Sequence, residues 1–284
     1  MTLTRLAEMR AQREPIVMVT AYDYPEARAA ERAGVDMVLV GDSGAQVKLG
    51  YDSTVRVSVD EMIMLASAVH RGTESAFLVC DLPFGSIEVS DAQAVETAVR
   101  FVREAGVDAV KLEGGNETKS SRIRAIVAAG IPVVGHVGLT PQTATALGGL
   151  RAQGRTEESA RRVVREALAV QEAGACAMVI EAVPTEIVDA VLPQLRVPVI
   201  GIGAGPSDGQ VLVLQDLLGV TEGRTAAFVK RYGSIGEAST EAIAAYAAEV
   251  RSGAFPAAEH QYGAGEEAVR AAREAAGAAS GEND

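Results

Sequence analysis

A phrase that ends a helix and starts a strand recurs along the chain, and it restricts the fold more than any other feature. Its copies read ERAGVDMVLVGD, REAGVDAVKLEG, VAAGIPVVGHVG and QEAGACAMVIEA. In each copy an Ala-Gly pair closes a helical pattern and a short apolar run follows, which is the signal of a glycine helix stop before a strand. The stops are Gly34, Gly106, Gly130 and Gly174. Ser58 with Glu61, and Ser90 with Gln93, have the spacing of capping boxes at helix starts.

Short apolar runs predict the strands of an alternating α/β fold. They span 16–20, 36–40, 76–80, 108–112, 131–135, 176–180, 197–202 and 210–215. The runs lack strict alternation of apolar and polar residues, as expected for parallel strands that are buried on both faces. Eight such strands within about 250 residues favour a (β/α)8 TIM barrel over an open doubly wound sheet.

The barrel is expected to form one catalytic domain over residues 1–262. From 263 to 284 the sequence consists mainly of alanine, glycine and charged residues. Such a segment has almost nothing to bury, so we expect a mobile acidic tail that is helical only transiently.

Composition argues against several classes of protein. The formal net charge of -12 disfavours nucleic acid as a partner, because phosphate contacts need a clustered basic face. No run of about 18 apolar residues predicts a membrane span, and the charged N-terminal segment does not have the apolar centre of a signal peptide. The cysteines, Cys80 and Cys176, lie in apolar runs, which favours free thiols in a cytoplasmic protein over a disulfide framework.

Ionisable residues stand where five of the apolar runs end. They are Asp42, Asp81, Lys111, Glu113, His136 and Glu181. The carboxyl ends of barrel strands converge on the face that carries the active site in this architecture. We therefore expect these side chains to meet in one place.

The three acids Asp42, Asp81 and Glu113 predict a metal site. Carboxylates gathered without compensation would repel one another and raise their pKa values, whereas a hard divalent cation such as Mg²⁺ accepts oxygen ligands of this kind. The alternative for the trio is an ion-pair network with Lys111 and outside arginines. For any single acid, the alternative is a helix cap or a loop carboxylate.

Glu181 and His136 are candidates for acid–base chemistry. Glu181 ends a wholly apolar run, and partial burial there would raise its pKa toward the range of a general base. A structural acid bonded to nearby backbone is the alternative. His136 is either a pocket residue or a histidine at the barrel rim whose hydrogen bonds are satisfied.

A glycine-rich run, IGIGAG, covers residues 200–205. Because no Lys-Ser/Thr pair follows, it is not a Walker loop, and it lacks the last glycine of the dinucleotide fingerprint. Either the run binds phosphate, or its glycines let a flat ligand approach the backbone.

At the level of whole phrases, the sequence resembles the ketopantoate hydroxymethyltransferase family. The matching phrases occur in the family's order across roughly residues 15 to 262. They are TAYDYPEA (20–27), VGDS (40–43), GYDST (50–54), DLPFGS (81–86), VKLEGG (110–115), GHVGLTPQ (135–142), GGLRAQGR (148–155), IEAVP (180–184) and IGIGAGPSDGQVLVLQDLLG (200–219).

The resemblance implies a TIM barrel of the phosphoenolpyruvate/pyruvate superfamily, usually assembled as a homodecamer. It implies transfer of a hydroxymethyl unit from 5,10-methylenetetrahydrofolate and water to 3-methyl-2-oxobutanoate, which gives ketopantoate for pantothenate and coenzyme A synthesis. The reaction would pass through an enolate stabilised by one Mg²⁺ per subunit, to which the 2-oxo acid is chelated.

Site roles follow from matching positions. Asp42 and Asp81 would bind Mg²⁺ directly and border the substrate, and Glu113 would complete the metal site through water. The residues implied to contact the oxo acid or line its pocket are Ser43, Lys111 and His136. Glu181 would be the base.

The sequence departs from the family most clearly after Ser43. The family usually has Asp-Ser-Leu, a small residue and Met, where this chain has Asp-Ser-Gly44-Ala45-Gln46, and a position that is usually apolar is Lys48. Gln215 is a smaller departure. A wider or more polar pocket would shift preference among 2-oxo acids by only about 1 to 3 kcal/mol. The alternative is neutral drift in a tolerant loop.

Two other hypotheses remain beside this one. A Mg²⁺-dependent 2-oxo acid lyase would use the same metal without folate, but such relatives often place a cysteine on a mobile loop, and here both cysteines are in strands. A barrel kept only as a binding or assembly protein would show damage to the acidic trio or to Glu181, and the sequence shows none.

Overall fold

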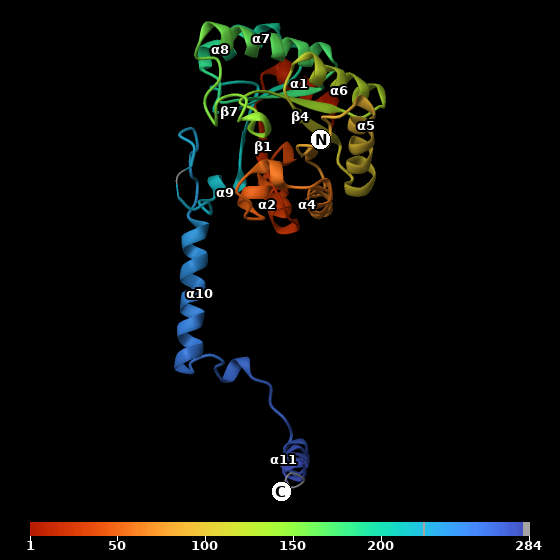
Figure 1. Ribbon diagram of the computed structural model, residues 1–284. Coiled ribbons are helices and arrows are strands. Elements are labelled where there is room, and N and C mark those ends of the chain that lie inside the picture. The colour runs from red at the N-terminus through yellow and green to blue at the C-terminus, as the bar shows by residue number, and fades with distance from the viewer. Residues whose placement is uncertain (224, 281–284) are drawn as a thin grey trace. The chain divides into compact units, whose positions relative to one another are not determined.

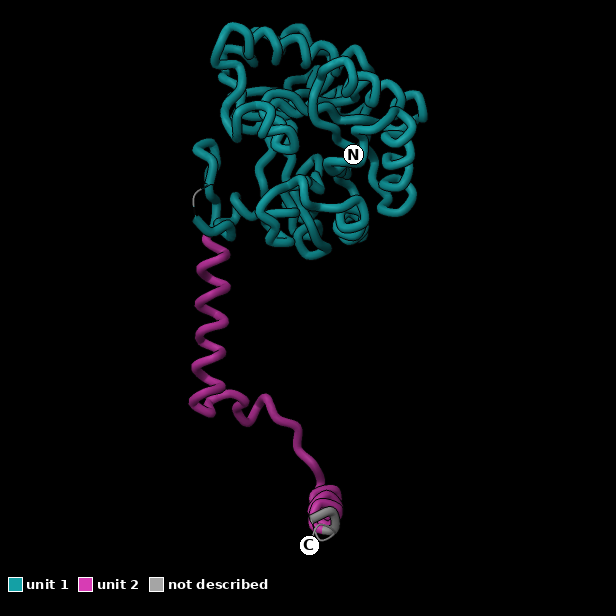
Figure 2. The backbone as a smooth tube through the Cα atoms, in the orientation of Figure 1, with its two compact units in different colours: residues 1–233 teal, residues 234–284 magenta. Residues whose placement is uncertain are grey.

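The computed structural model describes residues 1–223 and 225–280. It divides the chain into two compact units, Met1–Gly233 and Ser234–Asp284 (Figure 2). The boundary that we expected at residue 262 therefore does not coincide with the boundary between the units. The physical reason is that the helix Ile235–Ser252 buries none of its residues. The mobility of the last segment stays a prediction.

Eight parallel strands close into a barrel in chain order (Figure 1). They are β1 (Ile16–Thr20), β2 (Met37–Val40), β3 (Phe77–Asp81), β4 (Ala109–Glu113), β5 (Val133–Gly138), β6 (Ala177–Glu181), β7 (Val199–Ile202) and β8 (Gly209–Leu212). Each strand pairs in parallel with the next, and β8 pairs with β1. The TIM-barrel prediction is confirmed.

Helices alternate with the strands in the first unit. They are α1 (Leu3–Gln12), α2 (Tyr24–Ala33), α3 (Gly44–Val47), α4 (Val59–Gly72), α5 (Asp91–Arg100), α6 (Glu117–Ala128), α7 (Glu157–Glu172), α8 (Thr185–Val191) and α9 (Leu214–Leu217). Three short 3-10 helices are η1 (Thr54–Arg56), η3 (Pro141–Thr143) and η4 (Leu192–Gln194), and η2 (Phe101–Ala105) is a π-helix that directly follows α5. The second unit contains α10 (Ile235–Ser252), η5 (Ala258–His260) and α11 (Glu266–Ser280).

The predicted helix signals mostly behave as expected. Ser58 and Glu61 form a reciprocal capping box at the start of α4. Ser90 accepts the Gln93 N–H, but the Gln93 side chain accepts from Val89 instead of Ser90, so the second box is only half formed. The four predicted glycine stops all have positive φ, which L side chains rarely adopt.

β5 is shifted along the chain relative to the predicted run 131–135. β5 starts at Val133, because Pro132 has no N–H to donate to the ladder, and it continues to Gly138. His136 therefore lies inside the strand instead of after it. Its backbone is held in the sheet between β4 and β6.

Strand side chains divide between two hydrophobic clusters according to their parity. One cluster contains every second residue, such as Met37, Val79 and Val134, together with side chains of α1. The alternate residues, such as Val38 and Cys80, belong to the cluster that the outer helices cover. Since successive strand residues point to opposite faces, parity decides which side chains face the barrel interior.

Two further findings bear on the class of protein. None of the described helices has the length and apolar character needed to cross a membrane. Both cysteines are free; Cys80 is buried and Cys176 is partly buried.

Candidate active site

The inward parity of the strands continues into the predicted site residues. Val79, Val134 and Val179 face the barrel interior. Two positions after each of them, and therefore on the same face of its strand, lie Asp81, His136 and Glu181. The Lys-Leu-Glu sequence of β4 turns both of its charged residues inward and its leucine outward. A cavity of about 770 Å³ lies at these strand ends. All seven predicted residues line it, namely Asp42, Ser43, Asp81, Lys111, Glu113, His136 and Glu181.

A buried ion pair occupies the wall formed by β3 and β4. Asp81 and Lys111 are register partners in the sheet, and Lys111 Nζ lies 2.5 Å from Asp81 Oδ1. Burial disfavours the ammonium, but the carboxylates of Asp81 and Glu113 outweigh it, so the pKa of Lys111 lies above its ordinary value. Lys111 therefore stays charged. This pair is the one part of the alternative ion-pair network, between the acids and Lys111, that is observed among the described residues.

The charge of Asp42 is less well compensated than that of Asp81, which pairs with Lys111. Its backbone N–H donates to Asp81 Oδ2 at 3.0 Å, which brings the two carboxylates together. Burial and then the negative charge of Asp81 raise the pKa of Asp42 to about 7, although Lys111 acts in the opposite direction. A further positive charge would therefore stabilise the ionised form of Asp42.

Gln142 connects Glu113 with Asp42, and no pattern in the sequence pointed to this role. Its backbone N–H donates to Glu113 Oε2 at 3.0 Å, and its Nε2 donates to Asp42 Oδ2 at 2.9 Å and to the Leu82 carbonyl. Burial and the charge of Asp42 raise the pKa of Glu113 well above its ordinary value. The only signal in the sequence was an amide side chain shortly after a strand.

Glu181 and His136 meet on neighbouring strands. His136 Nε2 lies 3.2 Å from Glu181 Oε2, and His136 Nδ1 lies 3.6 Å from Glu113 Oε1, but neither nitrogen makes a well-aligned hydrogen bond within the described residues. Burial and the charge of Lys111 lower the pKa of His136, so its imidazole is neutral. The side chain of Glu181 is 17% exposed and reaches the cavity.

A second residue that the sequence analysis missed is Tyr22, which orients Ser43. The two hydroxyl oxygens are 2.8 Å apart, and the tyrosine is fully buried. A Cβ on Gly44 would lie 2.6 Å from the Tyr22 ring, so glycine lets this ring pack directly on the loop backbone. The Gly44 that departs from the family pattern thus has a packing function in this chain.

Lys48 and Gln215, which also depart from the family pattern, converge on one carboxylate. Lys48 Nζ lies 2.5 Å from Asp23 and 2.8 Å from Glu26, and the Gln215 amide donates to the same Glu26 oxygen at 2.9 Å. The other oxygen of Glu26 accepts the Tyr22 N–H. A continuous set of contacts therefore runs from Lys48 through Glu26 and Tyr22 to the Ser43 hydroxyl.

These contacts predict that Lys48 holds the α3 loop against α2. We expect Lys48→Met to speed amide hydrogen exchange of residues 44–49 about 3- to 5-fold, because partly exposed ion pairs contribute about 1 kcal/mol at most. Global unfolding should change little, and Lys48→Arg should retain the protection. Arg56→Met is the control, because it removes an exposed ion pair with Asp52 that does not reach α2. Equal exchange in wild type and Lys48→Met would show that the loop is held without Lys48.

The glycine-rich run borders the outer part of the cavity. Gly203 has positive φ, and a Cβ there would lie 2.4 Å from the Phe228 ring. The missing side chain at Gly203 thus makes room for the Phe228 ring, and both residues line the cavity. The two interpretations of the run, phosphate binding or the approach of a flat ligand, stay predictions.

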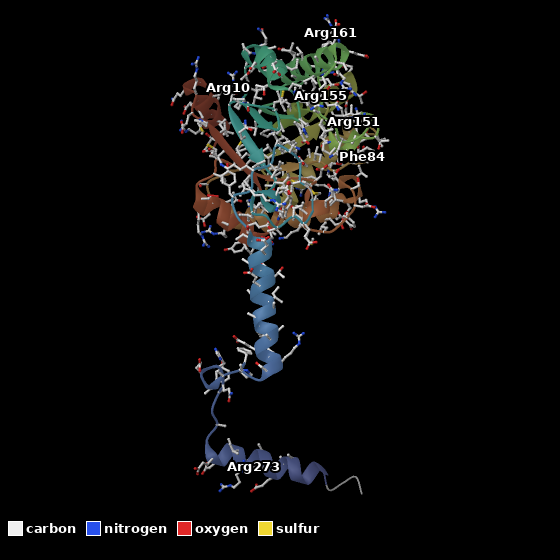
Figure 3. The ribbon with its side chains drawn as sticks, turned by 90° about the vertical axis from the view of Figure 1, so that its left-hand side faces the viewer. Arg10, Phe84, Arg151, Arg155, Arg161 and Arg273 are labelled. Carbon is white, nitrogen blue, oxygen red and sulfur yellow. The ribbon has the colours of Figure 1, made fainter. Side chains whose placement is uncertain are left out.

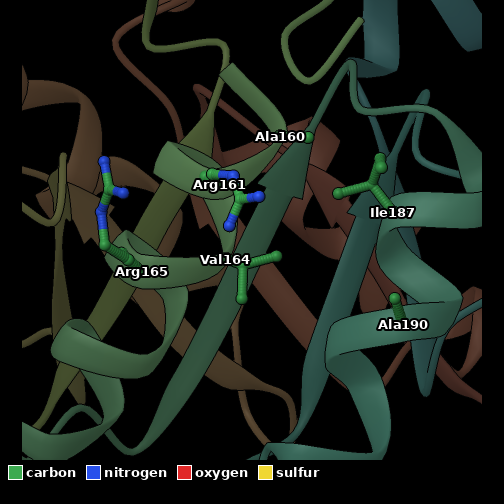
Figure 4. Close-up of a pocket in the computed structure, with 6 residues that line it drawn as sticks. All are labelled: Ala160, Arg161, Val164, Arg165, Ile187 and Ala190. Carbon is green, nitrogen blue, oxygen red and sulfur yellow. The ribbon is translucent and has the colours of Figure 1, made fainter. Parts of the chain in front are cut away.

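A separate pocket of about 390 Å³ lies on the outside of the barrel between α7 and α8 (Figure 4). Its lining residues are Ala160, Arg161, Val164, Arg165, Ile187 and Ala190. Among the described residues that line it there is no acid and no histidine. This pocket therefore offers no carboxylate or imidazole for acid–base chemistry.

The predicted metal ligands Asp42, Asp81 and Glu113 already make contacts with other side chains or backbone groups of the protein. Within residues 1–223 and 225–280, no group of three or more His, Cys, Asp or Glu side chains is arranged to hold a metal ion. Lys111 pairs with Asp81 and Gln142 donates to Asp42, so these two carboxylates already have partners. The predicted trio does line one cavity.

The fold and the site together define the class of protein. Polar side chains with shifted pKa values are gathered in one cavity at the carboxyl ends of barrel strands, which is where TIM-barrel enzymes have their active sites. The chain is a TIM-barrel enzyme by this criterion.

Comparisons with known proteins identify the family. The family model described as ketopantoate hydroxymethyltransferase matches residues 1–258. A 3-methyl-2-oxobutanoate hydroxymethyltransferase from Rhodococcus jostii is 52% identical over 90% of this chain and 89% of the relative. Those from Deinococcus radiodurans and Alkaliphilus metalliredigens are 51% and 49% identical, each over 90% of this chain and over 90% and 91% of the relative. The chain belongs to the ketopantoate hydroxymethyltransferase family.

Solved structures support the fold assignment. A phosphonopyruvate hydrolase in complex with oxalate and Mg²⁺ superimposes with a TM-score of 0.60, covering 92% of this chain and 93% of that protein at 16% identity. A 2,3-dimethylmalate lyase of the PEP mutase/isocitrate lyase superfamily gives 0.58, covering 88% of both chains at 20% identity. These likenesses agree with the predicted barrel fold.

Proposed function

We propose that this chain makes ketopantoate by moving a one-carbon unit from 5,10-methylenetetrahydrofolate to 3-methyl-2-oxobutanoate, with Mg²⁺ bound in the cavity. Family membership makes the chain a 3-methyl-2-oxobutanoate hydroxymethyltransferase, an enzyme of pantothenate synthesis. The folate donor, the metal and the residue roles are the proposed part. The observation that carries them is the single cavity that all seven candidate residues line.

In the balanced reaction, the oxo acid loses its C3 proton and C3 bonds to the methylene carbon of the folate. Water supplies the oxygen of the new hydroxymethyl group, and tetrahydrofolate leaves. The protein must therefore hold the carboxylate and ketone of the oxo acid, take one proton at C3, and admit the folate from the open side.

The acids of the cavity suit a divalent cation. Asp42 and Asp81 would hold Mg²⁺ directly, and Glu113 through water. The raised pKa of Asp42 is what an undercompensated buried carboxylate produces, and a cation would relieve it. Mg²⁺ commonly uses only one or two protein carboxylates and keeps several waters, so it does not need three side chains gathered in advance. When bound, the ion would polarise the ketone as a Lewis acid.

Glu181 would take the C3 proton. Its carboxylate reaches the cavity beside the imidazole of His136. Because this imidazole is neutral, it does not hold the Glu181 carboxylate in an ion pair. His136 would line the pocket and limit where Glu181 can lie. A positioned carboxylate base of this kind contributes about 10²- to 10⁴-fold to a proton transfer.

The carboxylate of the oxo acid would be held from the β4 side. Lys111 keeps its charge because of the surrounding acids, and the Ser43 hydroxyl is oriented by Tyr22. Both groups line the cavity close to the proposed metal ligands. They would orient the oxo acid so that C3 faces Glu181.

Assembly and location complete the proposal. We propose a homodecamer, which is the assembly that the family resemblance implied. The two free thiols support a reducing, cytoplasmic setting.

The function is tested by following ketopantoate formation with NMR, using EDTA-treated protein, 5,10-methylenetetrahydrofolate and a panel of 2-oxo acids. Activity should be lost after chelation and return with Mg²⁺, and 3-methyl-2-oxobutanoate should have the highest kcat/KM. Because Gln46 lines the cavity, the second candidate is the same reaction on another oxo acid. That candidate would be favoured by a preference of about 10- to 200-fold for a different panel member. Turnover without folate would point to a lyase, and undiminished activity after chelation would contradict the metal.

A further inference from the structure

The cavity is charged differently at its two ends. Its inner end contains the carboxylates and Lys111, which is neutralised by Asp81. Its outer part is lined by the segments 150–152 and 226–229 and by Arg155. The outer wall is thus partly apolar, with Leu150 and Phe228, and partly cationic, with Arg151 and Arg155. The two arginines are labelled in Figure 3.

Arg151 and Arg155 are cations without partners. Both are exposed, and within residues 1–223 and 225–280 neither guanidinium makes an ion pair or a hydrogen bond. In contrast, Arg162, a few residues along the chain, donates to Gln153 at 2.5 Å. In a protein with a net charge of -12, two uncompensated guanidinium groups beside one cavity form a local anion-binding feature.

We infer that Arg151 and Arg155 bind the glutamate carboxylates of the folate co-substrate. This inference rests on the proposed function. The methylene carbon of the folate must reach C3 of the oxo acid at the inner end, between the acids and Glu181. The aminobenzoyl group separates the glutamate from this carbon, so the glutamate lies toward the outer part of the cavity, where the two arginines are.

The chemistry of the outer part matches the rest of the folate. Phe228 and Leu150 offer apolar surface to the flat pteridine and aminobenzoyl groups. The guanidinium is a planar fork that binds a carboxylate through two parallel hydrogen bonds, and it is well suited to partly exposed sites because it is weakly hydrated. Two arginines match the two carboxylates of one glutamate.

The test compares two ligands in equilibrium binding without oxo acid. Tetrahydropteroate has the pteridine and aminobenzoyl groups of tetrahydrofolate but no glutamate. Calorimetric titration of both ligands into wild type and into the Arg151→Gln/Arg155→Gln double variant isolates the contribution of the glutamate. Arg161→Gln is the matched control, because Arg161 is an exposed arginine that lines the separate pocket between α7 and α8 and not the cavity (Figure 4).

Wild type should bind tetrahydrofolate about 10-fold more tightly than tetrahydropteroate, as expected for charge-assisted hydrogen bonds at a partly exposed site. The double variant should lose this difference, and its affinity for tetrahydropteroate should stay within about 2-fold of wild type. Added salt should weaken tetrahydrofolate binding in wild type more than in the double variant. Arg161→Gln should match wild type.

The inference would be overturned by unchanged tetrahydrofolate affinity in the double variant, or by an equal loss for both ligands. If the double variant only raised the KM for the oxo acid, the arginines would attract the oxo acid instead. Wild type that binds neither pteridine would contradict the folate donor itself. Wild type that binds both ligands equally would overturn the role of the arginines and leave the proposed function intact.

Discussion

Glu181→Gln is expected to slow exchange of the C3 proton of 3-methyl-2-oxobutanoate by about 10²- to 10⁴-fold. The amide keeps the size and shape of the carboxylate but cannot accept the proton. Exchange is followed by proton NMR in D₂O with Mg²⁺ and without folate, so the measurement reports the first chemical step alone. Folding should be unaffected, because the Glu181 side chain is partly exposed at the end of β6.

Two further variants make this result specific. Glu186→Gln is the control, because Glu186 is an exposed acid at the start of α8 and does not line the cavity. His136→Gln tests the neighbouring group and should have the smaller effect, since His136 is neutral and lines the pocket. Wild-type exchange in Glu181→Gln, together with lost exchange in His136→Gln, would assign the base to the histidine.

Removing one partner of the buried pair between Asp81 and Lys111 should have the largest effect on stability. Their side chains are only 5% and 4% exposed, so either single variant, Asp81→Asn or Lys111→Met, leaves a buried charge without its partner. Each should lower the free energy of unfolding by about 3 to 5 kcal/mol. The measurement is urea unfolding in EDTA at one fixed protein concentration.

The double variant Asp81→Asn/Lys111→Met measures how strongly the two charges are coupled. Its loss of unfolding free energy should be clearly smaller than the sum of the losses in the single variants, because neither charge is then left without a partner. Arg124→Met is the surface control, since its ion pair with Glu117 is well exposed and should contribute about 0 to 1 kcal/mol. Additive losses, or single losses as small as that of the control, would contradict a tightly coupled buried pair.

Much of the barrel could be predicted because its signals are local. An Ala-Gly stop, a capping serine and a short apolar run each act within a few residues, and all eight predicted strands start within two residues of the observed ones. β5 extends three residues further than predicted and thus includes His136. The extension depends on pairing with β4 and β6, which no local signal encodes.

The candidate site was predicted in its residue types but not in its contacts. Carboxylates after apolar runs were visible in the sequence, and they do line one cavity. Tyr22 and Gln142 were missed because each acts through a partner distant in the sequence. Tyr22 meets Ser43 from another strand end, and Gln142 reaches Asp42 across 100 positions of the chain.

By itself, the sequence determined the alternation of helices and strands, the fold class, and which ionisable groups stand at the strand ends, because these follow from periodicity and from chemistry within short segments. Only the tertiary structure decided that Lys111 neutralises Asp81, that the pKa of Asp42 rises to about 7, and that the first compact unit ends at Gly233. Charge pairing and burial depend on which distant residues share a space, and that is settled only when the barrel closes.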